Sequence, residues 1–249
     1  MKKVHFVLQA KGGIGKSYVS SLLSQLLKNL YDNVLVIDLD QENPTLSQYD
    51  GIGASRLSVM DENHSIDPMM FDKLIEMLIE HKGDVVVDTG ANTFSSLLAY
   101  IIQNQTFDLI KDNGKDIVVH SIIGGGDTMY DTANGFVDIA NYVDGGIVLW
   151  LNEHFGSLVS STGVKVEDAK FYKENSHKLI GTVTLKKRSI EFDKTINKMN
   201  GLRLTFAEVE DSDKFDFSER NRLKNIVQKD IFAQLNRIFE STNSEAVAA

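Results

Sequence analysis

The sequence contains no cysteine, and only two of its 249 residues are proline. Without cysteine the chain can form neither disulfide bonds nor thiolate metal sites, which is compatible with a reducing cytoplasm. The six histidines show no metal-ligand spacing, so we expect no transition-metal site. The apolar stretch after Lys2 and Lys3 is too short for a secretory signal, and no run of about 18 apolar residues occurs. We therefore expect a cytoplasmic protein without stable membrane insertion.

Positive charge is also scarce, with 26 basic against 35 acidic residues and a formal net charge of -9. This balance predicts no general attraction to nucleic acid, although a local basic face would be compatible with it. The densest basic cluster is Lys186-Lys187-Arg188, which we interpret as a solvated turn. With 42% hydrophobic residues the chain can build one large core. We predict a single domain over residues 1–240 and a disordered tail over 241–249.

A glycine-rich loop follows the first apolar stretch of the chain. Residues 4–8 resemble a buried strand, residues 9–17 are QAKGGIGKS, and a helical pattern starts near Lys16. Backbone N–H groups at a helix start bind phosphate, the lysine reaches the β- and γ-phosphates, and the next hydroxyl ligates Mg²⁺. Ala10 stands where the strict motif has its first glycine. Rather than an ordinary glycine turn, we predict a nucleotide triphosphate site formed by Gly12, Gly13, Ile14, Gly15, Lys16, Ser17 and Tyr18.

Carboxylates stand at the ends of two further strand-like runs. Asp38 and Asp40 follow the apolar run 34–37, and Asp88 follows the run 85–87. Because the carboxyl ends of parallel strands converge on one edge of a sheet, these side chains should lie near the glycine loop. Carboxylates there can hold a magnesium-bound water and orient an attacking one. The alternatives are an acidic turn without function and a helix cap.

Strand-like and helical segments alternate along the chain. Further strands are expected at 116–123, 146–151, 178–184 and 202–206, and helices at 16–32, 71–79, 190–199 and 218–239. This order predicts an α/β fold with a doubly wound, mostly parallel sheet in three α/β/α layers, similar to a Rossmann fold. A nucleotide would bind at the carboxyl ends of the strands.

Two further segments lie outside these motifs. The helix at 218–239 carries acids as well as bases, so we expect it to dock on the domain rather than on a membrane surface. Residues 49–68 are polar and weakly periodic, and we interpret them as a surface excursion without an assigned role.

Lys11 extends the loop to KGGIGKS, which resembles the deviant Walker A motif of the ParA and MinD ATPases, the nitrogenase iron protein and their relatives. The segment Asp38-Leu39-Asp40 is similar to the second acidic motif of that family, although Gln41 stands where proline is usual. Asp88 resembles the Walker B aspartate. The resemblance implies that Lys11 crosses a dimer interface to contact the partner's nucleotide. It also implies that Asp38 and Asp88 lie near Mg²⁺ and that Asp40 positions the hydrolytic water.

Asn152 follows the strand expected at 146–151. On its own an asparagine there indicates a turn. In the family an asparagine at this strand end commonly contacts adenine, so the resemblance makes Asn152 a candidate for base recognition. Three segments, VHFVLQAKGGIGKSYV from Val4, WLN from Trp150 and LTFAE from Leu204, resemble the TraL-type P-loop proteins of plasmid conjugation.

Together these motifs imply a Mg·ATP-dependent switch. ATP would close two subunits face to face, with Lys11, Lys16 and Asp40 as catalytic residues, and hydrolysis would reopen this homodimer. The expected role is plasmid conjugal transfer or maintenance, with conjugation or partition proteins as partners. One alternative is a ParA-like partition ATPase that binds nonspecific DNA. Two others are a small-molecule P-loop transferase and a module that holds ATP without hydrolysing it.

Overall fold

The computed structural model describes the backbone of residues 2–248 and the side chains of residues 2–240. Its centre is a seven-stranded sheet in the order β3-β2-β4-β1-β5-β6-β7, and every pair of neighbouring strands is parallel. The strands are β1 (Lys2–Leu8), β2 (Val34–Asp38), β3 (Ser55–Arg56), β4 (Asp84–Asp88), β5 (Lys115–Gly124), β6 (Ile147–Asn152) and β7 (Leu179–Leu185). The predicted doubly wound α/β sheet is therefore confirmed.

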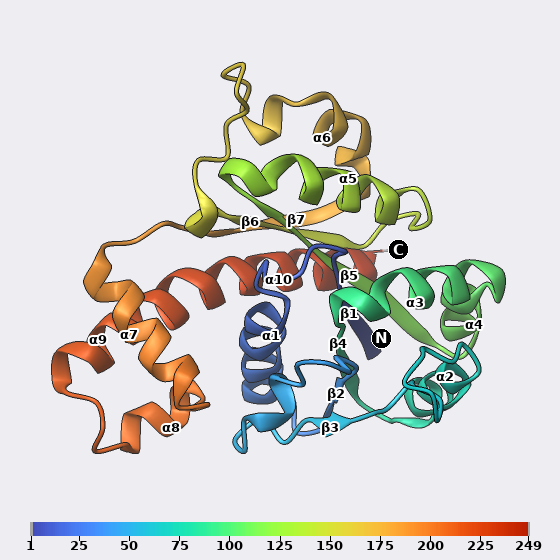
Figure 1. Ribbon diagram of the computed structural model, residues 1–249, viewed down its shortest axis with the longest axis horizontal. Helices are drawn as coiled ribbons and strands as arrows, with labels where there is room; N and C mark the ends of the chain where they lie inside the picture. The colour runs from blue at the N-terminus through green and yellow to red at the C-terminus, as the bar shows by residue number, and fades with distance from the viewer. Residues whose placement is uncertain (1, 249) are drawn as a thin grey trace.

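Helices cover both faces of this sheet (Figure 1). One face carries α1 (Lys16–Leu30), α7 (Ile190–Gly201), α8 (Phe206–Asp211), α9 (Phe217–Ile226), the π-helical segment η6 (Val227–Phe232) and α10 (Ala233–Ala248). The other carries α2 (Met70–Glu80), α3 (Ala91–Gln103), α4 (Thr106–Asp112), α5 (Met129–Ala140) and α6 (Lys170–Asn175). Short 3-10 turns lie at Leu46–Gln48, Gly126–Thr128, Glu153–Phe155, Val166–Asp168 and Ser176–Lys178.

The strand sequences explain the three layers. In β1, Val4, Phe6 and Leu8 point into the core beneath α2 to α5, whereas Val7 points into the core beneath α1. Alternate residues of a strand face opposite sides, so a strand that is apolar on both sides needs cover on both sides. Because all strands are parallel, their carboxyl ends meet along one edge, where the glycine loop and both acidic segments lie.

The prediction of a strand at 202–206 is wrong. These residues link α7 to α8, and Thr205 is the N-cap of α8. The Thr205 hydroxyl accepts from the Glu208 N–H, and the Thr205 N–H donates to Glu208 Oε2 at 2.8 Å. This capping box stabilises a helix start, and the short apolar pattern around it had suggested a strand.

The surface-excursion interpretation of residues 49–68 is also wrong in part. Tyr49, Ile52, Leu57 and Val59 are buried, and residues 55–56 form β3 at the edge of the sheet. The apolar side chains are spaced irregularly because they belong to turns rather than to a periodic element, so the pattern concealed their burial.

The C-terminal helix docks on the sheet, as predicted. Leu223, Ile226, Ile231 and Leu235 are buried in the same core as α1. It is, however, interrupted by the π segment η6, where an α-helix had been expected throughout. The predicted tail at 241–249 concerns residues whose side chains lie outside the described part of the chain, and it stays a prediction. Among the described residues, no helix combines the length and apolar character needed to cross a membrane.

Candidate nucleotide-binding site

The loop between β1 and α1 has backbone conformations that only glycine adopts easily. Gly13 and Gly15 have φ angles of 69° and 102°, in the left-handed region. Gly15 is the N-cap of α1 and has no side chain to occupy the first N–H groups of the helix. These groups and the positive end of the helix are therefore available to an anion lying in the loop.

Lys16 folds back across this loop. Its ammonium nitrogen donates to the backbone oxygen of Lys11 at 3.0 Å, and the residue is only 7% exposed. Burial lowers the pKa of Lys16, and the carboxylates of Asp88 and Asp40 partly oppose that effect. A cation that is removed from water and bonded to a neutral carbonyl gains most from an anionic partner, such as a phosphate group.

Gln9 anchors the start of the loop. Its side-chain amide donates to the backbone oxygens of Ile122 in β5 at 2.7 Å and Thr132 in α5 at 3.0 Å, and its oxygen accepts from the Ala10 N–H at 2.8 Å. Gly135 leaves room for this side chain, because a Cβ there would lie 2.2 Å from Gln9 Oε1. The loop is thus tied to two elements far away in the sequence.

Asp88 lies buried at the end of β4. Its Oδ1 accepts from the Ser20 hydroxyl at 2.7 Å, whereas its Oδ2 has no hydrogen-bond partner. Burial raises the pKa of Asp88 to about 7, although the hydroxyls of Ser17 and Ser20 partly counter this. An orphaned carboxylate oxygen beside the Ser17 hydroxyl fits a Mg²⁺ ion held directly or through water.

The acidic segment after β2 forms a braced turn. Asp38 is fully buried, and its two oxygens accept from the N–H groups of Asp40 at 3.1 Å and Ser47 at 2.9 Å. Burial raises the pKa of Asp38, and these backbone bonds partly oppose the rise. Asp40 lies nearer the surface and accepts from two N–H groups of its own turn. A Cβ on Gly90 would lie 2.9 Å from the Asp40 carboxylate, so β2 and β4 end in contact.

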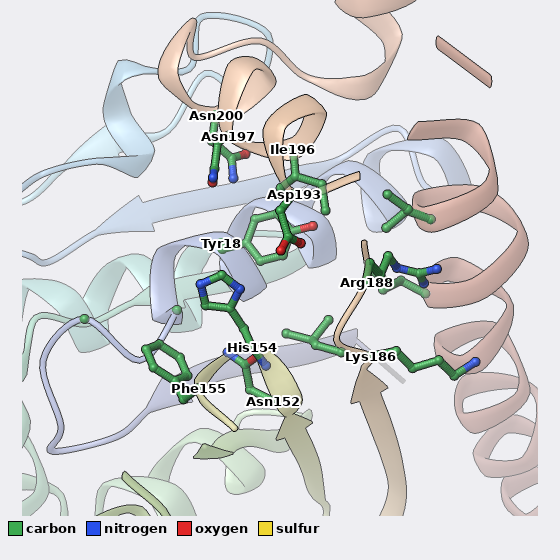
Figure 2. A pocket seen from close by; sticks show the side chains of 15 residues that line it. Tyr18, Asn152, His154, Phe155, Lys186, Arg188, Asp193, Ile196, Asn197 and Asn200 are labelled. Carbon is green, nitrogen blue, oxygen red and sulfur yellow. The ribbon is translucent and has the colours of Figure 1, made fainter. Parts of the chain in front are cut away.

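Two cavities meet at the loop. One, of about 380 Å³, lies between the loop residues from Gly12 to Tyr18, Asp40 and Asn92. The other, of about 310 Å³, extends from Gly13, Gly15 and Tyr18 toward the carboxyl ends of β6 and β7 (Figure 2). The first is lined by most of the predicted phosphate-binding residues and by Asp40, but not by the buried Asp38 and Asp88. The second has the size of a small-molecule subsite.

Asn152 lies between the loop and the second cavity. Its Nδ2 donates to the Ile14 backbone oxygen at 3.1 Å, and its Oδ1 accepts from the His154 N–H at 3.1 Å. Figure 2 shows His154 and Phe155 on the same side of the cavity. The predicted base-recognition residue therefore also supports the glycine loop, because one of its amide hydrogens and its oxygen are already engaged within the protein.

The Lys11 side chain binds an aspartate of α5 and lines neither cavity. Its ammonium nitrogen lies 2.7 Å from Oδ2 of Asp131 in α5, with both side chains about half exposed. Among the described residues that line the two cavities, Lys11 does not appear. The structure therefore brings Lys16, Ser17, Asp38, Asp40, Asp88 and Asn152 to one strand edge, and it pairs Lys11 with a carboxylate outside both cavities.

Sequence reasoning missed several residues of this region. Gln9 gave a weak signal, because a polar residue at the end of a buried strand often has a specific partner. Asp131, Asp193 and Asp230 lie on helices far from the loop in the sequence and gave none. Asp193 lines the second cavity, and Asp230 binds two residues of its wall.

A strand, a glycine loop closed by Lys16 and Ser17, and a buried strand-end aspartate together define a P-loop nucleotide-binding protein. A family model described as ParA, NUBPL iron-transfer P-loop NTPase, matches residues 1–110. Two proteins named Protein TraL from Escherichia coli are 34% and 32% identical, over 94% and 95% of this chain and 98% of each relative. The chain belongs to the TraL family, and its first 110 residues match the ParA-type P-loop NTPase model.

Solved structures share the fold. The MinC:MinD cell division protein complex from Aquifex aeolicus matches with a TM-score of 0.53 and 13% identity, covering 91% of this chain and 95% of that one. A putative plasmid partition protein from Borrelia burgdorferi B31 bound to AMPPNP also gives a TM-score of 0.53 at 13% identity, covering 97% and 100%. At such identities the likeness concerns the fold alone.

Proposed function

We propose that this protein is a Mg·ATP-dependent switch ATPase, with residues 1–240 acting as one unit, that serves plasmid conjugal transfer or maintenance. The observation that carries the proposal is the free, buried Oδ2 of Asp88 beside Ser17 and Lys16. A buried carboxylate oxygen without a partner costs stability, and a P-loop Mg²⁺ would remove that cost. The family of the chain supports nucleotide binding in general, and the AMPPNP bound to the Borrelia protein agrees with it.

In this proposal the triphosphate lies in the cavity of about 380 Å³ and the nucleoside in the cavity of about 310 Å³. The backbone of Gly12, Gly13 and Gly15 holds phosphate oxygens. Lys16 exchanges the Lys11 carbonyl for the β- and γ-phosphates, a charge-assisted bond that is roughly twice as strong as a neutral one. Tyr18, which lines both cavities, lies where the two parts of the nucleotide join.

Ser17 and Asp88 are the residues that would hold Mg²⁺. When bound, the ion neutralises charge on the β- and γ-phosphate oxygens. Asp38, whose oxygens already accept from Asp40 and Ser47, would lie near the ion and keep the Asp40 turn in place. Among the described residues, no cluster of three His, Cys, Asp or Glu side chains could hold a metal. Phosphate and water would therefore complete the coordination.

Asp40 is proposed to orient the attacking water by accepting a hydrogen bond from it. The water oxygen forms a bond to the γ-phosphorus while the bond from that phosphorus to the bridging oxygen breaks, giving ADP and phosphate. Lys11 is proposed to leave Asp131 and contact the nucleotide of a second subunit. Both charges of the Lys11–Asp131 pair are partly exposed, so breaking it costs about 1 kcal/mol or less.

Molar mass by light scattering tests the switch. The wild type, Asp40→Ala and Lys11→Ala are compared with Mg·ATP, with Mg·ADP and without nucleotide. We expect a dimer with ATP alone, trapped by Asp40→Ala and lost in Lys11→Ala. Lys173→Ala is the matched control, because Lys173 also pairs with an aspartate on the surface, at 3.6 Å from Asp168.

The other outcomes favour the other candidates. A monomer under all conditions, despite measured ATP binding, would contradict the crossing lysine and favour a transferase or a passive ATP-binding module. Phosphate release insensitive to Asp40→Ala would remove the hydrolytic role of that residue. An ATP-dependent, salt-sensitive shift of nonspecific DNA would favour a partition ATPase.

A further inference from the structure

Basic and acidic side chains have different orientations around the cavity of about 310 Å³. Its wall contains two cations, Lys186 and Arg188, and one carboxylate, Asp193. Lys186 Nζ lies 3.3 Å from Asp230 Oδ1, and an Arg188 guanidinium nitrogen lies 2.5 Å from Asp230 Oδ2. Figure 2 shows both basic side chains directed away from the cavity and Asp193 directed into it. The solvated-turn interpretation of the 186–188 cluster is therefore wrong, because Asp230 binds two of its three members.

The fold holds Asp230 firmly in this position. Asp230 lies in the π segment η6, and only 17% of its side chain is exposed. Gln234 donates to Asp230 Oδ1 at 2.9 Å, and its amide also pairs with both the N–H and the C=O of Thr184 in the edge strand β7. The C-terminal helix is thus hydrogen-bonded to β7 just before Lys186 and Arg188. Single π turns within α-helices are frequent at functional sites.

Asp193 is left without a charged partner. Among the described residues it makes no salt bridge and no side-chain hydrogen bond. It lies on α7, one and two turns before Asn197 and Asn200, so all three face the same cavity (Figure 2). A carboxylate flanked by amides accepts hydrogen bonds from hydroxyl or amino groups, which a nucleoside carries and a bare polyphosphate lacks.

We propose that Asp230 is a positioning residue that keeps Lys186 and Arg188 away from Asp193, so that Asp193 can accept a hydrogen bond from the nucleoside. This inference rests on the proposed function, because it assumes that the cavity takes the nucleoside of ATP. Without Asp230, the carboxylate that remains to Arg188 among the described residues lining the same cavity is that of Asp193. A guanidinium paired there would fill the cavity and occupy the nucleoside's partner.

The test compares two ligands that share their phosphates. Dissociation constants for Mg·ATP and Mg·tripolyphosphate are measured by calorimetry for the wild type and Asp230→Asn. We expect Asp230→Asn to weaken ATP about tenfold, which corresponds to one charge-assisted hydrogen bond, and to leave tripolyphosphate within about twofold. Equal weakening of both ligands, or of neither, would overturn the inference.

Glu219→Gln is the matched control. Glu219 on α9 has the same 17% side-chain exposure and binds Lys198 at 2.7 Å, but neither residue lines the cavity. A general loss of stability from a broken ion pair should therefore appear in both variants, whereas the change in ATP affinity should appear in Asp230→Asn alone. Asp230→Glu should restore most of the affinity. A Glu219→Gln protein with the same selective loss of ATP would contradict the proposed role.

A double-mutant cycle tests whether Asp230 affects ATP affinity through Asp193. In an Asp193→Ala background, Asp230→Asn should cause no further loss of ATP affinity, because the two residues act on the same contact. Independent, additive losses would show that Asp230 acts otherwise. ATP analogues without the 2′-hydroxyl, the 3′-hydroxyl or the 6-amino group then identify the donor, as the one whose removal no longer matters in Asp193→Ala. A wild type that binds neither ATP nor tripolyphosphate would refute the proposed function, whereas binding of both without an Asp230 effect refutes this inference alone.

Discussion

The two cavities beside Tyr18 differ in how the chain forms them. The cavity of about 380 Å³, where we propose that the phosphates bind, is called the phosphate-side cavity below. It is lined by residues from segments 12–18, 40–45 and 91–92, all within the first 92 residues. The cavity of about 310 Å³, where we propose that the nucleoside binds, is called the nucleoside-side cavity. Its lining residues come from the loop, the ends of β6 and β7, helix α7 and the C-terminal helix, as far as Ile231. The family model matches residues 1–110, which contain the whole of the first cavity and only the loop of the second. If the proposed function holds, phosphate binding is thus a short-range property of this chain, whereas selection of the nucleoside depends on distant segments.

The largest expected effect tests the phosphate side directly. Lys16→Ala should weaken both Mg·ATP and Mg·tripolyphosphate by about 100-fold, because the lysine contacts only the shared phosphates. Calorimetry measures both affinities. Lys28→Ala, on the same helix with its ammonium bonded to the Ile52 carbonyl, serves as control and should leave both unchanged. A selective loss of ATP in Lys16→Ala would break the division between the two cavities.

A second prediction tests whether the glycine loop also depends on α5, which is distant in the sequence. Gly135→Ala in α5 places a Cβ 2.2 Å from Gln9 Oε1, so it should displace the buried amide that anchors the loop. We expect a loss of about 2 kcal/mol in the free energy of unfolding, typical of overpacking, together with weaker tripolyphosphate binding. Urea unfolding measures the first effect. Gly145→Ala, where a Cβ meets nothing within 4 Å, should be neutral, and a loss of the same size there would contradict the explanation.

A third prediction concerns pH in the absence of nucleotide and metal. Burial raises the pKa of Asp88 to about 7, above the value near 3.9 of an unfolded aspartate. The folded state therefore binds the proton more tightly, and ionisation of Asp88 destabilises it progressively as the pH rises from about 4 to about 7. Asp88→Asn removes this penalty. Its free energy of unfolding relative to wild type should rise with pH by up to about 1.4 kcal/mol per unit in that range.

Urea unfolding at several pH values in the presence of EDTA measures this difference. A difference between wild type and Asp88→Asn that does not change between pH 5 and 7 would mean that Asp88 is not protonated in the apo protein. Ionised Asp88 would then not destabilise the apo protein, and Mg²⁺ binding would remove no such penalty.

The smallest effect concerns the contact between the loop and α5. Asp131→Asn frees Lys11 from a partly exposed ion pair, so the ATP-dependent dimer should tighten by about two- to fivefold, the range of a surface salt bridge. Light scattering at graded protein concentrations measures the dimer constant. Asp168→Asn, which breaks the longer Lys173–Asp168 pair, should not change it. Weaker dimers in Asp131→Asn would indicate that Asp131 guides Lys11 instead of restraining it.

Much of the fold could be predicted because it depends on local patterns. The continuous apolar runs at 34–37 and 85–87 became β2 and β4, and the spacing of leucines after Lys16 became α1. The errors arose where local patterns were ambiguous. The segment 202–206 looked like a strand, but the capping box of Thr205 and Glu208 starts a helix there. The π turn at 227–232 has no periodic signal in the sequence. Asp230 within it binds Lys186 and Arg188, which follow β7, and Gln234 just after it binds Thr184 in β7.

The sequence by itself determined where the predicted phosphate-binding residues and the strand-end aspartates lie in the fold. Glycines, Lys16 and Ser17 are contiguous, and strand-end aspartates in a parallel sheet must converge, so spacing and topology are sufficient. Only the tertiary structure decided that Gln9 anchors the loop through α5, that Lys11 pairs with Asp131, and that Asp230 binds Arg188 and Lys186. The physical reason is that these contacts join side chains on separate elements, whose distances depend on packing and leave no trace in local sequence.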